Sequence, residues 1–484
     1  MFIDPQQIAE TVVMASPFPF TLYTFKSRSP VWGVLIAILA LGGWMRLTDI
    51  AQTHVPRPFG PDAWHYFNYA YNILHHGVYS KDPSILSGIA PVADGLRTPG
   101  YPLFLIPFIA LLPGDTFIAP VLKVQAWMSL LTLVLTYVLA RSVLPVALAL
   151  LATFLTALCP HLISMNHYLL TESLFTFLLV ASLVLLTRKG GWPLWFAIGI
   201  VVCLAGMVRP IWFYFLPIAI WLIGTRQAVP NRKKRSLAFV LGFFLIMTPW
   251  MVRNKISLGT LSDSSSMNSS MAQGIYPQIT YDSNPKTFGY PYRFDPRFQE
   301  ISASKGTILK EFLTRLTHEP WRYLHWYILE KPVWLWSWSI IQGQGDIFIY
   351  PVTHSPYFEQ PWFQFSHHIM AATHWIFVFL GGIGCILPWL PRKFQPTTRE
   401  PSLFTARLLS LTLGFMTGIH MIVPPYPRYS IPLRPLLYCM ALYCLWGIFT
   451  NLARWSVSRF GKQGVTDEPQ EASRSPQEYP HIGP

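Results

Sequence analysis

The stretch VWGVLIAILALGGWMRL, from Val31 to Leu47, is an apolar run long enough to cross a lipid bilayer as a helix. Charged residues make up 12% of the chain and hydrophobic residues 52%, whereas soluble proteins carry about 25% charged residues. The sequence therefore predicts an all-α polytopic membrane protein with about ten transmembrane helices. Besides Val31–Leu47, these runs lie near 118–140, 143–159, 168–187, 192–208, 211–224, 236–251, 369–390, 403–423 and 431–450.

Basic residues collect in alternate connections between these runs, which is the pattern of cytoplasmic loops in membrane proteins. We therefore expect both termini in the cytoplasm and the loops 49–117 and 252–368 outside. The location expected is the plasma membrane, in bacteria the inner membrane, with functional residues on the outer, periplasmic side. The basic residues concerned are Arg141, Arg188, Lys189, Arg226, Arg232, Lys233, Lys234, Arg235, Arg392, Lys393 and Arg399.

The ends of the chain and its net charge add little to function. Residues 1–30 form the expected cytoplasmic N-terminal segment, and the Pro-, Ser-, Gln- and Glu-rich tail 451–484 is expected to be disordered. The net charge of +14 comes from basic residues scattered among the spans, so we expect no nucleic-acid partner. The five cysteines all lie in or beside apolar runs without metal-binding spacing.

The first outer loop, 49–117, carries an unusual acidic residue. In PRPFGPDAWHYFNYAYNILHHGVY, from Pro56 to Tyr79, Asp62 precedes a stretch whose apolar residues have helical spacing. We expect this helix, and a second short one over Tyr101–Leu112, to lie on an apolar surface at the membrane interface. Asp62 has two interpretations, a helix N-cap or a proton acceptor.

A second acid, Glu172, opens the span near 168–187, where a charge is costly and usually functional. It could orient a substrate, bind a metal with Asp62, or pair with an arginine. Arginines at the outer span ends could bind phosphate through their planar fork, or extend toward lipid headgroups instead. These candidates are Arg97, Arg209, Arg253 and Arg428, with His167 as a neutral donor. The tryptophans from Trp334 to Trp338 could stack on a sugar, but at a membrane surface such residues more often form an interfacial aromatic belt, which we expect here.

Four motifs in this order resemble the GT-C superfamily of membrane glycosyltransferases. The likeness is to the branch related to dolichyl-phosphate-mannose protein mannosyltransferases, which includes bacterial enzymes that decorate lipopolysaccharide. It covers the expected transmembrane module 31–255 well and the outer loop 256–368 and the C-terminal helices 369–450 weakly. The motifs are Gly60-Pro61-Asp62, Arg97 to Pro102 (RTPGYP), His167 to Glu172 (HYLLTE), and Pro249 to Asn254 (PWMVRN).

The resemblance implies a sugar transfer from a polyprenyl-phosphate donor to a hydroxyl of a glycan, lipid or protein acceptor, on the outer face and with inversion. It implies Asp62 as the base, Glu172 as a second catalytic acid, and a GT-C-type fold with a long outer loop after the seventh span. Substrate and phosphate binding are implied for Arg97, Tyr101, His167, Arg253 and Arg428.

Metal dependence stays open at this stage. Many family members carry an Asp-Glu pair at the position of Asp62, whereas Ala63 follows it here. If a metal binds, Mg²⁺ or Mn²⁺ held by Asp62 and Glu172 is the natural choice. Two other functions remain open: a transporter or flippase of lipid-linked sugars, and an O-antigen ligase or polymerase.

Overall fold

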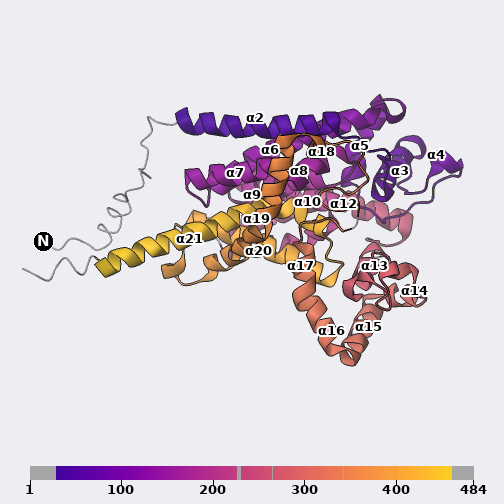
Figure 1. Ribbon diagram of the computed structural model, residues 1–484. Helices are drawn as coiled ribbons and strands as arrows, with labels where there is room; N and C mark the ends of the chain where they lie inside the picture. The colour runs from indigo at the N-terminus through magenta and orange to yellow at the C-terminus, as the bar shows by residue number, and fades with distance from the viewer. Residues whose placement is uncertain (1–28, 226–230, 264, 342, 398, 461–484) are drawn as a thin grey trace, which may run out of the picture.

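The computed structural model describes residues 29–225, 231–263, 265–341, 343–397 and 399–460, and its regular elements there are all helical (Figure 1). The only β pairing in these ranges is two isolated bridges. The N-terminal segment and residues 461–484 lie outside the described residues. The long helices are α2 (Ser29–Gln52), α6 (Ile118–Arg141), α7 (Val146–Leu158), α9 (Glu172–Leu186), α10 (Trp192–Val208), α12 (Arg232–Leu258), α19 (Pro361–Ile386), α20 (Glu400–Ile422) and α21 (Arg434–Phe460).

Six helical segments are long and apolar enough to cross a membrane, or seven if the bent pair Val146–Leu158 and Pro160–His167 counts as one span. The expected runs near 168–187, 192–208 and 211–224 are helical but shorter: α9, α10, and η3 (Pro210–Phe215) followed by α11 (Leu216–Thr225). A polytopic membrane protein is therefore present in the described residues, while the number ten stays a prediction.

Glycines let pairs of these helices pack with their backbones in contact. A Cβ on Gly199 of α10 would lie 2.0 Å from the carbonyl oxygen of Phe239 in α12, and one on Gly242 2.0 Å from that of Phe196. Small residues permit this close approach between membrane helices, where van der Waals packing drives association. The pair α10 and α12 is accordingly among the most closely packed in the bundle.

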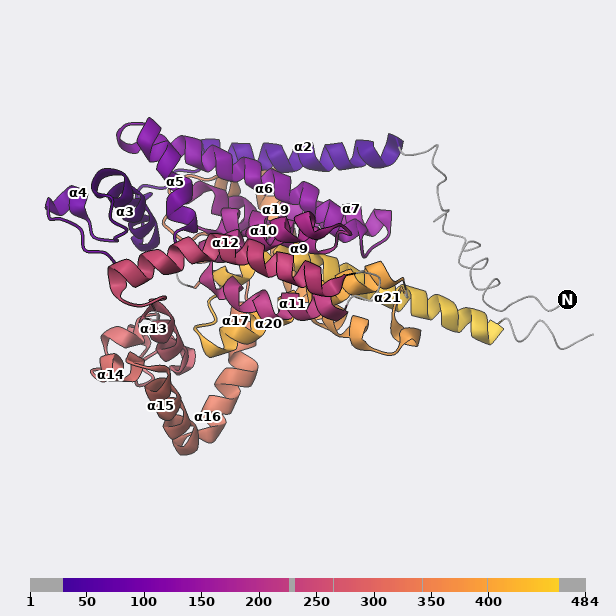
Figure 2. The same ribbon diagram turned by 180° about the vertical axis from the view of Figure 1, so that it is seen from behind.

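The two long connections, 53–117 and 259–360, lie at one end of the bundle, opposite the end where α2 begins (Figures 1 and 2). There α3 (Pro61–His76) packs on α5 (Gly100–Leu111) and buries Tyr66, Phe67 and Ala70. The apolar residues of this helix, which we expected at the membrane interface, thus pack against the protein itself. We call this end, which carries Asp62, the site end.

A small domain projects from the site end in both views (Figures 1 and 2). It contains α13 (Ser265–Gly274), α14 (Phe298–Ser302) and α15 (Lys305–His318) around a core that includes Ile275, Tyr276 and Phe298. The chain returns from it through α16 (Pro320–His325), the π-helical turn η7 (Trp326–Glu330) and α17 (Lys331–Leu335). Shorter helices are α4 (Ser84–Ser87), η1 (Gly114–Phe117), α8 (Pro160–Ser164), η2 (Met165–His167), α18 (Pro356–Glu359) and η10 (Pro427–Leu433).

Two expectations differ from the structure. The aromatic belt is wrong for Trp336, which is buried and donates from Nε1 to the hydroxyl of Thr417 at 3.2 Å. The indole of Trp336 thus packs inside the protein, with its N–H paired as a buried indole N–H usually is. Trp338 is partly buried, and its Nε1 donates to Asp346 at 2.7 Å. The helix α21 also runs through Phe460, past residue 451, where we expected the disordered tail to begin.

Candidate functional site

Asp62 sits in the first turn of α3 and faces two arginines. The N-cap of this helix is Gly60, with Pro61 at the first helical position and no side-chain cap, so the interpretation of Asp62 as the N-cap is wrong. Its Oδ1 accepts a hydrogen bond from Arg97 Nη2 at 2.5 Å and its Oδ2 one from Arg428 Nη1 at 2.8 Å. Burial would raise the pKa of Asp62, but the charges of Arg97 and Arg428 outweigh burial and hold that pKa well below its usual range.

Glu172 lies beside Asp62 with one guanidinium between them. It begins α9, its side chain is fully buried, and its Oε1 accepts from Arg209 Nη2 at 2.6 Å. The same oxygen accepts from Arg428 Nε, so Arg428 joins both carboxylates. The structure therefore brings the two acids close together, on either side of the Arg428 guanidinium.

The cluster formed by Asp62, Glu172, Arg97, Arg209 and Arg428 has three cations and two anions, and so one excess positive charge. A buried excess charge is unfavourable unless a counter-charge arrives. Free hydrogen-bonding atoms lie in the same place. Among the described residues, three buried atoms around Asp62 lack a hydrogen-bond partner: Arg97 Nε, His65 Nδ1 and Tyr350 Oη. The cluster is thus arranged to accept an anion with hydrogen-bonding oxygens.

Tyr350 comes from the second outer loop and closes over the start of α3. Its ring lies so near Gly60 that a Cβ there would approach the ring carbon Cζ to 2.1 Å. Burial and the neighbouring charge of Asp62 raise the pKa of its phenol, so the hydroxyl stays neutral at physiological pH. Sequence reasoning missed Tyr350, because it lies in an irregular loop where no periodic pattern marks one tyrosine among many.

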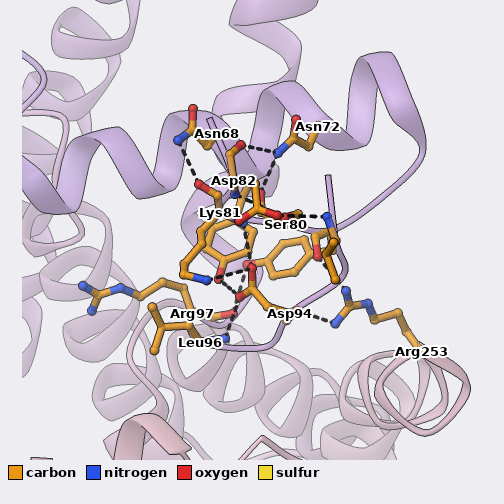
Figure 3. A network of polar contacts seen from close by, with 12 residues as sticks. Asn68, Asn72, Ser80, Lys81, Asp82, Asp94, Leu96, Arg97 and Arg253 are labelled. Atoms are coloured by element: carbon orange, nitrogen blue, oxygen red, sulfur yellow. Dashed lines mark hydrogen bonds and ion pairs between the residues drawn. The ribbon is translucent and has the colours of Figure 1, made fainter. Parts of the chain in front are cut away.

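Arg253 lies in a different network, which holds the first outer loop in place (Figure 3). The centre of this network is Asp94, whose carboxylate accepts from Tyr69 Oη and from the backbone N–H groups of Lys81 and Leu96. Arg253 reaches the loop from α12 and donates to the backbone oxygens of Asp94 at 2.8 Å and Tyr79 at 2.7 Å.

The network positions Arg97 for the cluster. Tyr79 Oη donates to the backbone oxygen of Arg97 at 3.0 Å, while the guanidinium of Arg97 extends to Asp62. Arg253 itself stacks on the rings of Tyr79 and Trp250, and its hydrogen bonds in the described part of the chain go to Asp94, Tyr79 and Asn254. In place of Arg253, the structure brings Arg209 into the cluster.

Tyr101 and His167 lie behind the cluster, each with a buried partner. Tyr101 Oη donates to Gln125 at 2.7 Å, and its ring meets that of Tyr66 edge-on at 5.0 Å. His167 Nδ1 contacts Asp49 Oδ2 of α2 at 2.8 Å. Both residues therefore support the elements that carry the cluster, and the polar partners that the described structure gives their side chains are Gln125 and Asp49.

A cavity of about 10 Å³ adjoins Glu172, with room for about one water molecule. Seven of its nine lining residues are polar, among them Arg46 of α2, which donates from Nε to the hydroxyl of Ser129 at 2.8 Å. The lining residues are Arg46, Ser129, Thr132, Thr156, Leu162, Met165, Glu172, Ser173 and Thr176.

The donor set does not fit the divalent metal considered from the sequence. The carboxylates of Asp62 and Glu172 are already bound by guanidinium groups, whose charges would repel Mg²⁺ or Mn²⁺. The residues that the structure describes contain no group of three or more His, Cys, Asp or Glu side chains able to hold a metal ion.

No protein-family profile matches this sequence, and a search of curated proteins finds no match. The structure is similar to the oligosaccharyltransferase AglB from Archaeoglobus fulgidus, solved with an inhibitory peptide and a dolichol-phosphate: 13% identity, a TM-score of 0.49, 93% of this chain and 53% of that one. It is also similar to ArnT from Cupriavidus metallidurans bound to undecaprenyl phosphate: 11% identity, a TM-score of 0.38, 92% of this chain and 82% of that one. This chain thus spans about half the length of the archaeal enzyme, and likenesses of this size do not establish a shared activity.

Proposed function

We propose that the protein is a GT-C-type membrane glycosyltransferase that moves a sugar from a polyprenyl-phosphate donor to an acceptor hydroxyl. The reaction takes place at the site end, on the outer, periplasmic face of the membrane. The observation that carries this proposal is the buried cluster of Asp62, Glu172, Arg97, Arg209 and Arg428, with its excess positive charge and unpartnered donors. A sugar–phosphate–lipid diester carries one negative charge, which matches the excess of one.

The chemistry follows from the same charge balance. The acceptor oxygen attacks the anomeric carbon, the bond from that carbon to the phosphate oxygen breaks, and the polyprenyl phosphate leaves with the electron pair. Asp62 takes the acceptor proton. The leaving phosphate gains a negative charge as Asp62 becomes neutral. The net charge of the phosphate thus changes from −1 to −2 while that of the cluster changes from +1 to +2, so the two stay balanced. Arg97 and Arg428 are placed to stabilise this developing charge.

The ion pairs of Asp62 before substrate binds imply that donor binding precedes proton transfer. Arg97 and Arg428 are bound to Asp62 in this structure, and a donor phosphate competes for the same guanidinium groups. Donor binding therefore weakens the pairs to Asp62 and raises the pKa of its carboxyl, which makes it a better proton acceptor. Glu172 is held by two guanidinium groups and is fully buried, so it is not free to act as a nucleophile. A single displacement with inversion fits this arrangement.

The proposal is tested with the full-length protein in proteoliposomes and a radiolabelled panel of polyprenyl-phosphate monosaccharides. Membranes from the expression host, including their glycans, lipids and proteins, supply acceptors. We expect label to pass from at least one donor into an acceptor fraction, with release of an equal amount of polyprenyl phosphate. Asp62→Asn protein is the control.

Two outcomes would replace this function with another. Movement of labelled donor across the bilayer without transfer would indicate a lipid-linked-sugar transporter or flippase. Consumption of polyprenyl-diphosphate oligosaccharide, with none of the monosaccharide panel consumed, would indicate an O-antigen ligase or polymerase.

A further inference from the structure

The chain between the projecting domain and the bundle, residues 320–335, is one helical segment made of α16, η7 and α17. One side of this segment packs on the protein through Tyr323, Trp326 and Leu335, which are buried. The other side is also apolar and covered by nothing in the described structure. The exposed fractions there are 82% for Trp321, 41% for Leu324, 63% for Ile328, 56% for Leu329 and 50% for Val333.

A helix that is apolar on both sides is stable only when both sides are shielded from water. Its inner side already has protein as a partner, so the outer side needs a second apolar surface. Single exposed leucines are ordinary on protein surfaces, but five large apolar side chains within thirteen residues form a continuous patch of the kind that marks an interaction site.

Lys331 fixes the depth of this segment in the membrane. Its ammonium is fully buried and donates to the backbone oxygens of Met421 at 2.6 Å and Val423 at 3.4 Å. These oxygens lie at the end of α20, which crosses the membrane by length and composition and ends at Ile422. The segment therefore leaves the bundle at the level where a membrane-crossing helix ends at the site end.

From this level α16 extends away from the bundle and crosswise to the long helices in both views (Figures 1 and 2). A helix that runs crosswise to the spans at the membrane edge runs along the lipid surface. This position suits a tryptophan such as Trp321, because the indole ring with one N–H donor is most stable at the boundary between hydrocarbon and water.

The charged groups on the segment are arranged for the same environment. Arg322 Nη1 donates to Glu319 at 2.7 Å, and His325 Nδ1 lies 2.8 Å from Glu330. Pairing lowers the cost of placing charged groups near lipid.

We propose that the exposed face of residues 320–335 lies in the lipid leaflet at the site end, between headgroups and acyl chains. It anchors the α13–α15 domain to the membrane through Trp321, Leu324, Ile328, Leu329 and Val333. The occupant of this face is lipid. This inference depends on the membrane-crossing helices and on the depth of Lys331, and holds whatever reaction the cluster performs.

The test is spin-label accessibility in the full-length protein, reconstituted in liposomes of phosphatidylethanolamine and phosphatidylglycerol. One nitroxide is attached at Ile328→Cys, a second at Trp321→Cys, and a control at Gln299→Cys, which is exposed on α14. The parent protein, with its five native cysteines, gives the background label to subtract. Collision rates with oxygen, which concentrates in lipid, are compared with those of a water-soluble nickel chelate.

We expect the logarithm of the oxygen-to-nickel ratio to be positive at positions 328 and 321 and negative at 299. Nickel-dominated collisions at both 321 and 328 would overturn the proposal, because the face would then be in water. Low collision rates with both reagents at 321 and 328 would also overturn it, since a protein, or a second copy of the chain, would then cover the face. Two labelled positions keep the test valid if one variant fails to fold.

Discussion

Replacing Asp62 with asparagine keeps the size of the side chain and removes both its negative charge and its ability to accept the acceptor proton. In the structure this carboxylate binds Arg97 at 2.5 Å and Arg428 at 2.8 Å, and its side chain is 28% exposed. Asparagine can still accept one hydrogen bond from either arginine, but the ionic part of both contacts is lost.

The expected loss of stability is small. Partly exposed ion pairs are screened by solvent and contribute about 1 kcal/mol or less each, so losing both costs about 2 kcal/mol at most. A domain with 5–15 kcal/mol of stability stays folded after such a loss. Removing the charge also raises the excess positive charge of the cluster from one to two, so binding of an anionic donor should not weaken.

The expected loss of turnover is large. If Asp62 accepts the proton, kcat should fall by about 10²–10⁴-fold while KM for the donor stays equal or falls. Both constants are measured by transfer of label from the donor found in the reconstituted assay, beside the melting temperature of each protein.

The matched control is Asp295→Asn in the projecting domain. Asp295 is buried, accepts from Tyr276 at 2.6 Å and lies 3.4 Å from Arg315, so this variant also loses an ion pair, but far from the cluster. It should lose stability and keep its kcat. Near-parental kcat in Asp62→Asn would refute the assignment of Asp62 as the proton acceptor.

Four further results are expected. Tyr350→Phe should melt like the parent, because its hydroxyl has no hydrogen-bond partner among the described residues, yet lose about 10-fold in kcat/KM if the hydroxyl binds substrate; unchanged kcat/KM would show that it does not. Glu172→Gln leaves Arg209 and Arg428 without their shared carboxylate and should cost about 3–5 kcal/mol, measured as a large fall in melting temperature; a parental melting temperature would contradict the buried pairing. Dialysis against a chelator should leave turnover unchanged, and a loss that Mg²⁺ restores would show that a metal binds. Because the pKa of Asp62 is lowered, its ion pairs stabilise the protein above the ordinary pKa of aspartate and are lost as pH falls through the lowered value. The acid midpoint of kcat/KM, which reports the free enzyme, should therefore lie below about 4. A midpoint near pH 6 that persists in His65→Gln would contradict this.

Much of the candidate site could be predicted because its signals are local. Glu172 and Arg428 stand at the ends of expected spans, where a charged residue is conspicuous in the sequence, and Asp62 and Arg97 lie in two short motifs of the first outer loop. The loop charges placed all four at the same side of the membrane, and the structure brings them into one cluster.

The remainder depends on which helices pack together, which local patterns do not show. Arg253 and Arg209 are both basic residues at span ends, but α12 turns Arg253 toward the first loop while α10 delivers Arg209 to Glu172. Asp62 is not the N-cap of its helix, because Pro61 takes the first helical position and places the N-cap at Gly60, two residues before Asp62. The preference of proline for the first helical position, as in Gly60-Pro61-Asp62, is the local signal that excludes Asp62 as the N-cap.

The chain distance across the cluster has a consequence for how the protein is made. Arg428 contacts Asp62 across 366 residues and Glu172 across 256. Spans enter the membrane in order of synthesis, so Asp62 and Glu172 lack Arg428 as a partner until the last helices are inserted. An incomplete chain therefore exposes an imperfectly paired carboxylate among apolar helices, a local instability that disappears only when α21 is inserted. The contact of Arg428 with the two acids, which gives the cluster its excess positive charge, therefore forms only in the complete chain.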